Sequence, residues 1–132
     1  MDLKILKIAT NTENNKEIKN YTHKAKYKNS MCGDEMEVSV KVGKDQILDF
    51  GYQCKSCIFC QASASILSNF SINNKISNID KAINFFETFF QNDETKIPKE
   101  FKKFKVLFHK SNLSRKECIL LPFKALNKAL KS

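Results

Sequence analysis

The feature that most constrains the fold is a strict alternation of apolar and polar residues over 35–42, "EMEVSVKV". The apolar side chains fall at every second position: Met36, Val38, Val40 and Val42. That period is typical of a β-strand with one buried face. Residues 43–45 have turn chemistry, and "ILDFGYQC" at 47–54 has the composition of a return strand. The sequence therefore predicts an antiparallel hairpin.

Beyond this hairpin the apolar spacing changes to that of helices. Residues 60–70, "CQASASILSNF", combine small side chains with a spacing that suits a closely packed helix. An amphipathic helix is predicted over 77–91, another begins at Pro98, and a last one spans about 114–130. We therefore expect the sheet to be followed by several helices.

Two shorter patterns precede the hairpin. Ile18, Tyr21 and Ala25 recur at helical spacing and predict a helix over 11–26, whereas "LKILKIAT" at 3–10 suggests a further strand. The order of elements predicts an α+β fold, in which a small antiparallel sheet of about three strands packs against several helices.

The whole chain is expected to form a single domain, residues 1–132. At 132 residues and 42% hydrophobic content it is large enough to bury its own core. Glycine and proline number only 3 and 2, and the sequence contains neither a repeat nor a long linker. These features exclude a low-complexity or loop-rich chain.

The formal net charge of +9 raises nucleic acid as a partner, but the lysines are scattered and mixed with asparagines. We therefore expect a solvated surface and no nucleic-acid footprint, with an acidic protein partner left open. No apolar run approaches the roughly 20 residues that span a bilayer, and the N-terminus does not resemble a signal peptide. A cytoplasmic location without membrane contact is the expectation, and cysteines there stay reduced.

Three of the five cysteines lie in one short stretch, "CKSCIFC" at 54–60. An internal disulfide framework would leave one thiol over, because the number of cysteines is odd. A structural zinc ribbon needs a second Cys-x2-Cys pair, and a thioredoxin-like redox pair needs a βαβ unit. A site of converging Cys and Asp side chains and a set of inert, packed cysteines both remain.

The positions of the remaining cysteines favour convergence. Cys32 precedes the first hairpin strand, the 54–60 cysteines lie where the sheet gives way to a helix, and Cys118 begins the last helix. The positive end of a helix stabilises a thiolate, the form that binds metal or attacks sulfur. Asp34 can add a carboxylate at the same place, and Gly33 permits the tight backbone between them.

Three separated segments resemble one known family, the U-type iron–sulfur cluster assembly scaffolds (the IscU, SufU and N-terminal NifU group). "NSMCGDEMEVSVKV" resembles the family's Asn-Pro-x-Cys-Gly-Asp and the strand after it. "CIFCQASASIL" resembles its Cys-x-Ile-Ser-x-Ala-Ser-x-Ser, and "RKECILLPFKAL" its C-terminal Arg-x-Lys-Cys-x-x-Leu-x-Trp-x-Ala-Leu. The resemblance extends from about residue 15 to residue 130.

The resemblance implies a set of metal or cluster ligands: Cys32, Asp34, Cys57 and Cys118. It implies a scaffold without independent turnover that takes persulfide sulfur from a cysteine desulfurase and serves apo iron–sulfur recipient proteins. The cofactor at this site would be Zn²⁺ or a [2Fe–2S] cluster, and Cys57 or Cys118 would accept the sulfur.

Two details favour the SufU branch of the family. Glu117 occupies the position where the IscU branch has a histidine, and 60 residues separate Cys57 from Cys118 (58–117). Cys54 and Cys60 are additions to the family pattern, with Cys54 either a bystander or a sulfur-handling thiol. Cys60 is an auxiliary ligand, a resolving thiol or, as we favour, a packing residue.

The hypothesis that competes with an iron–sulfur scaffold is a structural-zinc adaptor that binds protein or nucleic acid through its basic surface.

Overall fold

The computed structural model describes residues 3–30, 33–54, 57–91 and 96–132. The elements follow one another along the chain as α1 (Leu3–Ala9), β1 (His23–Lys28), β2 (Glu35–Gly43), β3 (Gln46–Cys54), α2 (Ile58–Ser71), β4 (Asn74–Lys75), α3 (Ile76–Glu87), the 3₁₀ helices η1 (Phe89–Gln91), η2 (Lys99–Val106) and η3 (Lys110–Arg115), and α4 (Lys116–Leu130).

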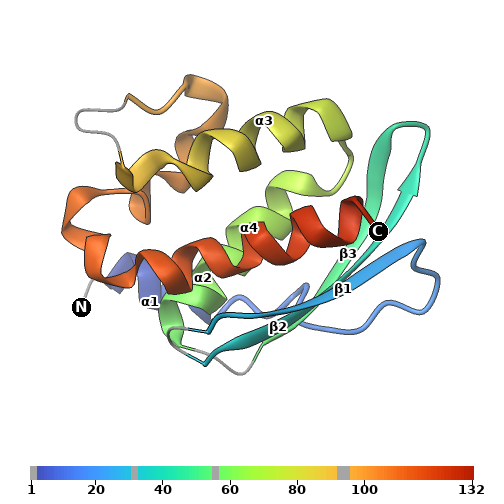
Figure 1. The fold of residues 1–132 in the computed structure, drawn as a ribbon, viewed down its shortest axis with the longest axis horizontal. Helices are drawn as coiled ribbons and strands as arrows, with labels where there is room; N and C mark the ends of the chain where they lie inside the picture. Colours follow the sequence, from blue (N-terminus) through green and yellow to red (C-terminus); the bar gives the residue numbers. More distant parts are fainter. Residues whose placement is uncertain (1–2, 31–32, 55–56, 92–95) are drawn as a thin grey trace.

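The predicted hairpin is confirmed as β2 and β3, the centre of an antiparallel sheet with strand order β1-β2-β3-β4 (Figure 1). Its register pairs Val38 with Tyr52 and places Gly43 opposite Gln46. The two residues between Gly43 and Gln46 are Lys44 and Asp45, with φ of 52° and 63°. Positive φ at both central positions is the geometry that suits a two-residue hairpin turn.

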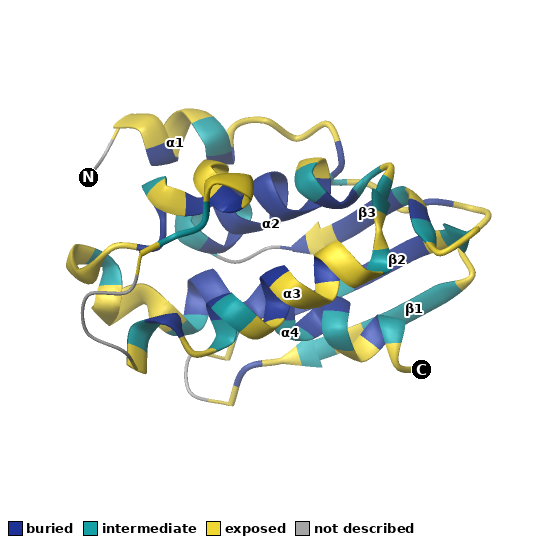
Figure 2. Cartoon of the chain, turned by 90° about the horizontal axis from the view of Figure 1, so that it is seen from above, coloured by how far each residue is buried: buried dark blue, intermediate teal, exposed yellow. Residues whose placement is uncertain are grey.

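The helices cover one face of this sheet, in agreement with the predicted α+β class (Figure 1). α4 packs on β1 and β2, α2 packs on β3 and α4, while α1 lies against α2 and α3 against α4. α2 is buried along most of its length, as Figure 2 shows. The apolar residues of the hairpin face this helical layer, and Met36, Val38, Val40 and Phe50 are fully buried.

The phenylalanines of the C-terminal half form an aromatic cluster under α3 and α4. Phe86 lies at its centre, with its ring centroid 4.1 Å from that of Phe108, 4.8 Å from Phe104 and 5.6 Å from Phe123. All four rings are buried. The sequence predicts a helix that begins at Pro98, and the structure has the 3₁₀ helix η2 there. Phe101, inside η2, has non-helical backbone dihedral angles.

Both predictions for the N-terminal segments are wrong. Residues 3–9 form helix α1, where Ile5 and Ala9 share one buried face four residues apart. The expected helix over 11–26 is replaced by irregular chain and by β1, whose Ala25 and Tyr27 pair with Val38 and Met36 of β2. Tertiary pairing with an existing strand has overridden the local helical spacing.

The irregular N-terminal segment packs onto the sheet face that the helices leave open, and Gly51 makes this approach feasible. The backbone N–H of Tyr52 donates to the carbonyl of Asn14 at 3.0 Å. A Cβ on Gly51 would lie 3.0 Å from Ile18 Cγ2, and it would come still closer to the carbonyl oxygen of Lys16. The backbone of the segment therefore occupies the space that any larger residue needs.

Replacing this glycine tests that packing. We expect Gly51→Ala to lower the free energy of unfolding by about 2–3 kcal/mol, because the backbone of Lys16 must move away. Gly43→Ala is the matched control, since its Cβ would meet only the flexible Leu48 side chain, at 2.9 Å. Urea denaturation of the three proteins measures the difference, and equal losses in both variants would contradict the close approach.

The buried phenol of Tyr52 gives a second test of the core. Burial first, and then negative charge at Cys54 and Cys60, raise the pKa of Tyr52 from 10.0 to about 12. The unfolded chain loses this proton near pH 10 and the folded chain near pH 12, so stability falls as the pH rises through that interval. Relative to Tyr52→Phe, the protein should lose about 2 kcal/mol there. Phenolate absorbance should show the late ionisation, and a Tyr52 step at 10.0 would contradict it.

Candidate metal centre

The loop between β1 and β2 carries Asp34 and is closed by its own backbone. The N–H of Asn29 donates to the carbonyl of Asp34, and the N–H of Gly33 donates to the carbonyl of Asn29, both at 2.8 Å. Gly33 has φ of +77°, a left-handed conformation that glycine adopts without steric cost. The loop therefore places the Asp34 carboxylate immediately before β2, with its side chain partly buried.

Two helices begin at the same end of the molecule. Cys57 is the N-terminal cap of α2, and its side chain makes no capping hydrogen bond. Cys118 is the third residue of α4. The hydroxyl of Ser63 in α2 donates to the carbonyl of Ile119 in α4 at 2.6 Å and fixes the two helices together. Both positive helix ends favour negative charge at this place.

These elements bring three of the four predicted site residues together. The ligand atoms of Asp34, Cys57 and Cys118 all lie within 4.8 Å of one another. The Sγ of Cys118 lies 3.8 Å from Oδ2 of Asp34. Zn–S bonds of about 2.3 Å and Zn–O bonds of about 2.1 Å put two ligands of one tetrahedral ion about 3.6–3.8 Å apart. The Cys118–Asp34 distance meets this value, and side-chain movements of about 1 Å would bring the whole group onto one metal ion; predicted Cys32 lies outside the described residues.

The structure adds a residue that our sequence analysis did not assign. The side-chain amide of Asn29 is buried and donates to Oε2 of Glu117 at 2.8 Å. Lys124 lies 3.9 Å from the same oxygen. Asn29 is part of the quoted Asn-x-x-Cys-Gly-Asp segment, so its position in that motif was the available signal. The bond ties the Asp34 loop to the helix of Cys118 and turns Glu117 toward the loop.

Cys54 and Cys60 are not members of this three-residue group, but they form a close pair of their own. Their Sγ atoms lie 3.4 Å apart, well beyond the roughly 2.05 Å of a disulfide bond. Both side chains are buried in the core. Cys54 ends β3 and Cys60 lies in the first turn of α2, so the pair flanks Cys57.

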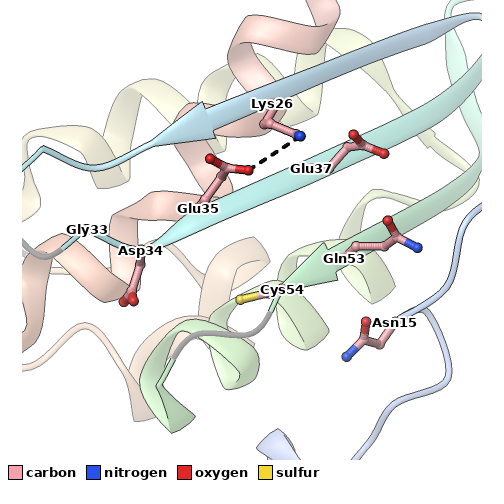
Figure 3. A pocket seen from close by; sticks show the side chains of 8 residues that line it. All are labelled: Asn15, Lys26, Gly33, Asp34, Glu35, Glu37, Gln53 and Cys54. Atoms are coloured by element: carbon pink, nitrogen blue, oxygen red, sulfur yellow. Dashed lines mark ion pairs between the residues drawn. The ribbon is translucent and has the colours of Figure 1, made fainter.

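A polar pocket of about 710 Å³ opens beside the candidate centre. Its lining comprises Asn15, Lys26, Gly33, Asp34, Glu35, Glu37, Gln53 and Cys54. Figure 3 shows Lys26 paired with Glu35, a contact of 3.4 Å, and the Cys54 sulfur directed toward the side where Asp34 lies. The pocket is therefore bordered by both Asp34 and Cys54.

Within the described parts of the chain, none of the helices is long and apolar enough to cross a bilayer.

A search of curated proteins gave no match. Solved structures do match. The N-terminal part of a nitrogen-fixing NifU-like protein from Brucella abortus is 20% identical, with a TM-score of 0.88 over 98% of this chain and 91% of that one.

A putative iron–sulfur cluster assembly scaffold protein for the SUF system of Fervidobacterium islandicum is 22% identical, with a TM-score of 0.83 over 98% of this chain and 96% of that one. A hypothetical protein is 20% identical, with a TM-score of 0.78 over the whole of both chains. These likenesses establish the fold. The family model of the NifU-like N-terminal domain matches residues 2–110, most of the chain, and the protein therefore belongs to that family.

Proposed function

We propose that the protein is a scaffold for iron–sulfur cluster assembly. The observation that carries this proposal is the convergence of Asp34, Cys57 and Cys118 on one point in a NifU-like fold. Among the structural neighbours, the protein from Fervidobacterium islandicum is described as a putative scaffold of this kind. This protein would act in the cytoplasm. A cysteine desulfurase would supply the sulfur, and apo iron–sulfur proteins would receive the cluster.

Cys32 completes the proposed ligand set, two residues before Asp34 in the sequence. Three thiolates and a carboxylate suit a tetrahedral Zn²⁺ ion, and the same four donors suit a [2Fe–2S] cluster as cargo. When zinc is bound, it keeps the thiolates deprotonated and ready for exchange. The Glu117 carboxylate accepts the hydrogen bond from the Asn29 amide, at the position where a histidine in the IscU branch would add a nitrogen, and this favours the SufU-like, zinc-dependent form.

Sulfur transfer needs an exposed thiolate near the donor. Cys57 is partly exposed, whereas the Cys118 side chain is 8% exposed, so Cys57 is the better acceptor. Its thiolate attacks the terminal sulfur of the desulfurase persulfide, a new S–S bond forms on Cys57, and the desulfurase cysteine leaves as its thiolate. Arg115, whose guanidinium lies 5.5 Å from the Phe59 ring centroid, adds positive charge beside α2 for an acidic partner.

Metal and sulfide analysis of protein purified without oxygen tests this function. We expect one tightly held zinc, or iron and acid-labile sulfide in equal amounts. Cys57→Ser and Cys118→Ser should each lower the content at least roughly tenfold, because each removes a soft ligand. Asp34→Ala should release an iron–sulfur cluster more slowly, since the hard, exchangeable ligand is lost, but should weaken zinc binding, since the ion loses one of its four donors. Asp80→Ala, an exposed carboxylate on α3, is the control.

The outcomes separate the forms of the proposal. Zinc without sulfide supports the sulfur relay, and iron with sulfide supports cluster assembly. Neither metal nor sulfide, together with no stimulation of a cysteine desulfurase, would contradict both. The structural-zinc adaptor differs in a further respect, because its fold should be lost when a chelator removes the metal. A folded, metal-free protein would exclude it.

The Asn29 contact gives a separate prediction about positioning. Asn29→Ala removes the hydrogen bond that ties the Asp34 loop to α4, so the carboxylate is no longer held beside Cys118. We expect zinc affinity to fall about tenfold, the loss typical of outer contacts of a metal site. Competition with a chromophoric chelator measures it, with Ser30→Ala, the exposed neighbouring residue, as control. Equal affinities in both variants would contradict a positioning role.

A further inference from the structure

The Cys54–Cys60 pair has the geometry of a dithiol that can close. The two sulfurs approach to 3.4 Å from different elements, the end of β3 and the first turn of α2. A side-chain rotation that brings them about 1.4 Å closer would form a disulfide bond. The sequence places Cys57 three residues from each of them, so the stretch contains two overlapping Cys-x2-Cys units that share the proposed sulfur acceptor.

Both partners of Cys57 are close to it along the chain. Cys57 is the N-terminal cap of α2 and Cys60 is the third residue of that helix, so about one helical turn separates them. Cys54 lines the pocket that Asp34 also lines, and its sulfur points toward that side of the pocket (Figure 3). Cys57 itself is partly exposed, so a small anion released there can leave to solvent.

The proposed function creates a need for electrons at this place. A persulfide carries its outer sulfur at the oxidation level of elemental sulfur, whereas a cluster contains sulfide, so two electrons must be added to each sulfur atom. Resting on the proposed function, we propose that Cys54 and Cys60 are the internal reductant that converts persulfide sulfur on Cys57 into sulfide.

The reaction balances in two exchanges. The Cys60 thiolate attacks the inner sulfur of the Cys57 persulfide, a Cys57–Cys60 disulfide forms, and hydrosulfide leaves with the electron pair of the broken S–S bond. The Cys54 thiolate then attacks the sulfur of Cys60, forms the Cys54–Cys60 disulfide and releases the Cys57 thiolate. The two protons given up by Cys54 and Cys60 pass to hydrosulfide and to Cys57. A dithiol reductant must reopen the pair before the next cycle.

The surroundings of the pair suit this exchange. Burial, and then negative charge at Cys54 and Cys60, raise the pKa of Tyr52 to about 12, so the phenol lies close enough to interact with both sulfurs. Met36 is the direct cross-strand partner of Cys54 and is fully buried, so the side of the pair that faces the core is shielded from water.

A single-turnover experiment tests the proposal. The reduced, metal-free chain is loaded under argon with one equivalent of glutathione persulfide, desalted at once, and left without reductant. We expect about one sulfide to be released per Cys57 persulfide, and mass spectrometry should find the Cys54–Cys60 disulfide. Cys54→Ser and Cys60→Ser should load equally. Cys60→Ser should release at least roughly tenfold less sulfide, whereas Cys54→Ser should release it normally and stop at the Cys57–Cys60 disulfide. Added dithiothreitol should restore release in Cys60→Ser.

Met36→Leu is the matched control, because it changes the packing beside Cys54 and keeps both thiols. Its sulfide release should equal that of the unaltered chain. Equal release from Cys60→Ser and the unaltered chain would overturn the proposal, as would a Cys54→Ser chain without the Cys57–Cys60 disulfide or a loaded chain that keeps its persulfide. Serine is nearly isosteric with cysteine, and thermal unfolding verifies that each variant is folded.

An independent measurement separates failure of this proposal from failure of the proposed function. Equilibration of the unloaded chain in glutathione redox buffers should yield the Cys54–Cys60 disulfide as the first bond formed, whether or not Cys57 accepts sulfur. If that disulfide forms but Cys57 takes up no sulfur from the persulfide or from a cysteine desulfurase, the proposed function fails and the internal reductant fails with it. If Cys57 loads but the pair does not oxidise, the internal reductant alone is overturned.

Discussion

The close packing of α2 against α4 on the sheet is the constraint on which the rest of the structure depends. Ser63 of α2 is fully buried, and its small side chain lets the two helices approach so closely that its hydroxyl donates directly to the Ile119 carbonyl of α4. This contact fixes where both helices begin. Because Cys57 and Cys118 lie at those beginnings, residues that are far apart in the sequence meet at one end of the molecule.

The sequence patterns that survive in the fold are the long ones. Alternation over 35–42 and the helical spacing after Cys57 each extend over enough residues to determine the buried face, and the structure has the strand and the helix there. The N-terminal segments are short, and the elements with which they pack decide their secondary structure. Residues 3–9 pack on α2, and residues 23–28 pair with the edge of β2. The Asn29–Glu117 hydrogen bond could not be predicted from the sequence either, because it joins a loop and a helix that only the tertiary fold brings together.

The ligands of the candidate centre are held in two different ways, some by the rigid core and one by a loop. Its two sulfurs described here belong to the first turns of α2 and α4, whose positions the core determines. Its carboxylate belongs to a loop held by two backbone hydrogen bonds and by the contact of Asn29 with α4. The thiols are therefore placed by packing, while Asp34 is placed by hydrogen bonds that a partner protein can disturb.

That difference matters for a protein whose proposed task is to give its cargo away. Thiolates are soft ligands that bind zinc and iron tightly, whereas a carboxylate is a harder donor better matched to magnesium, calcium or manganese. A site of thiolates alone would favour retention, and the Asp34 carboxylate introduces one weaker bond at the edge that faces the open pocket. The same edge carries Cys54, so exchange of the Asp34 ligand and reopening of the proposed thiol pair would share one opening beside β2 and β3.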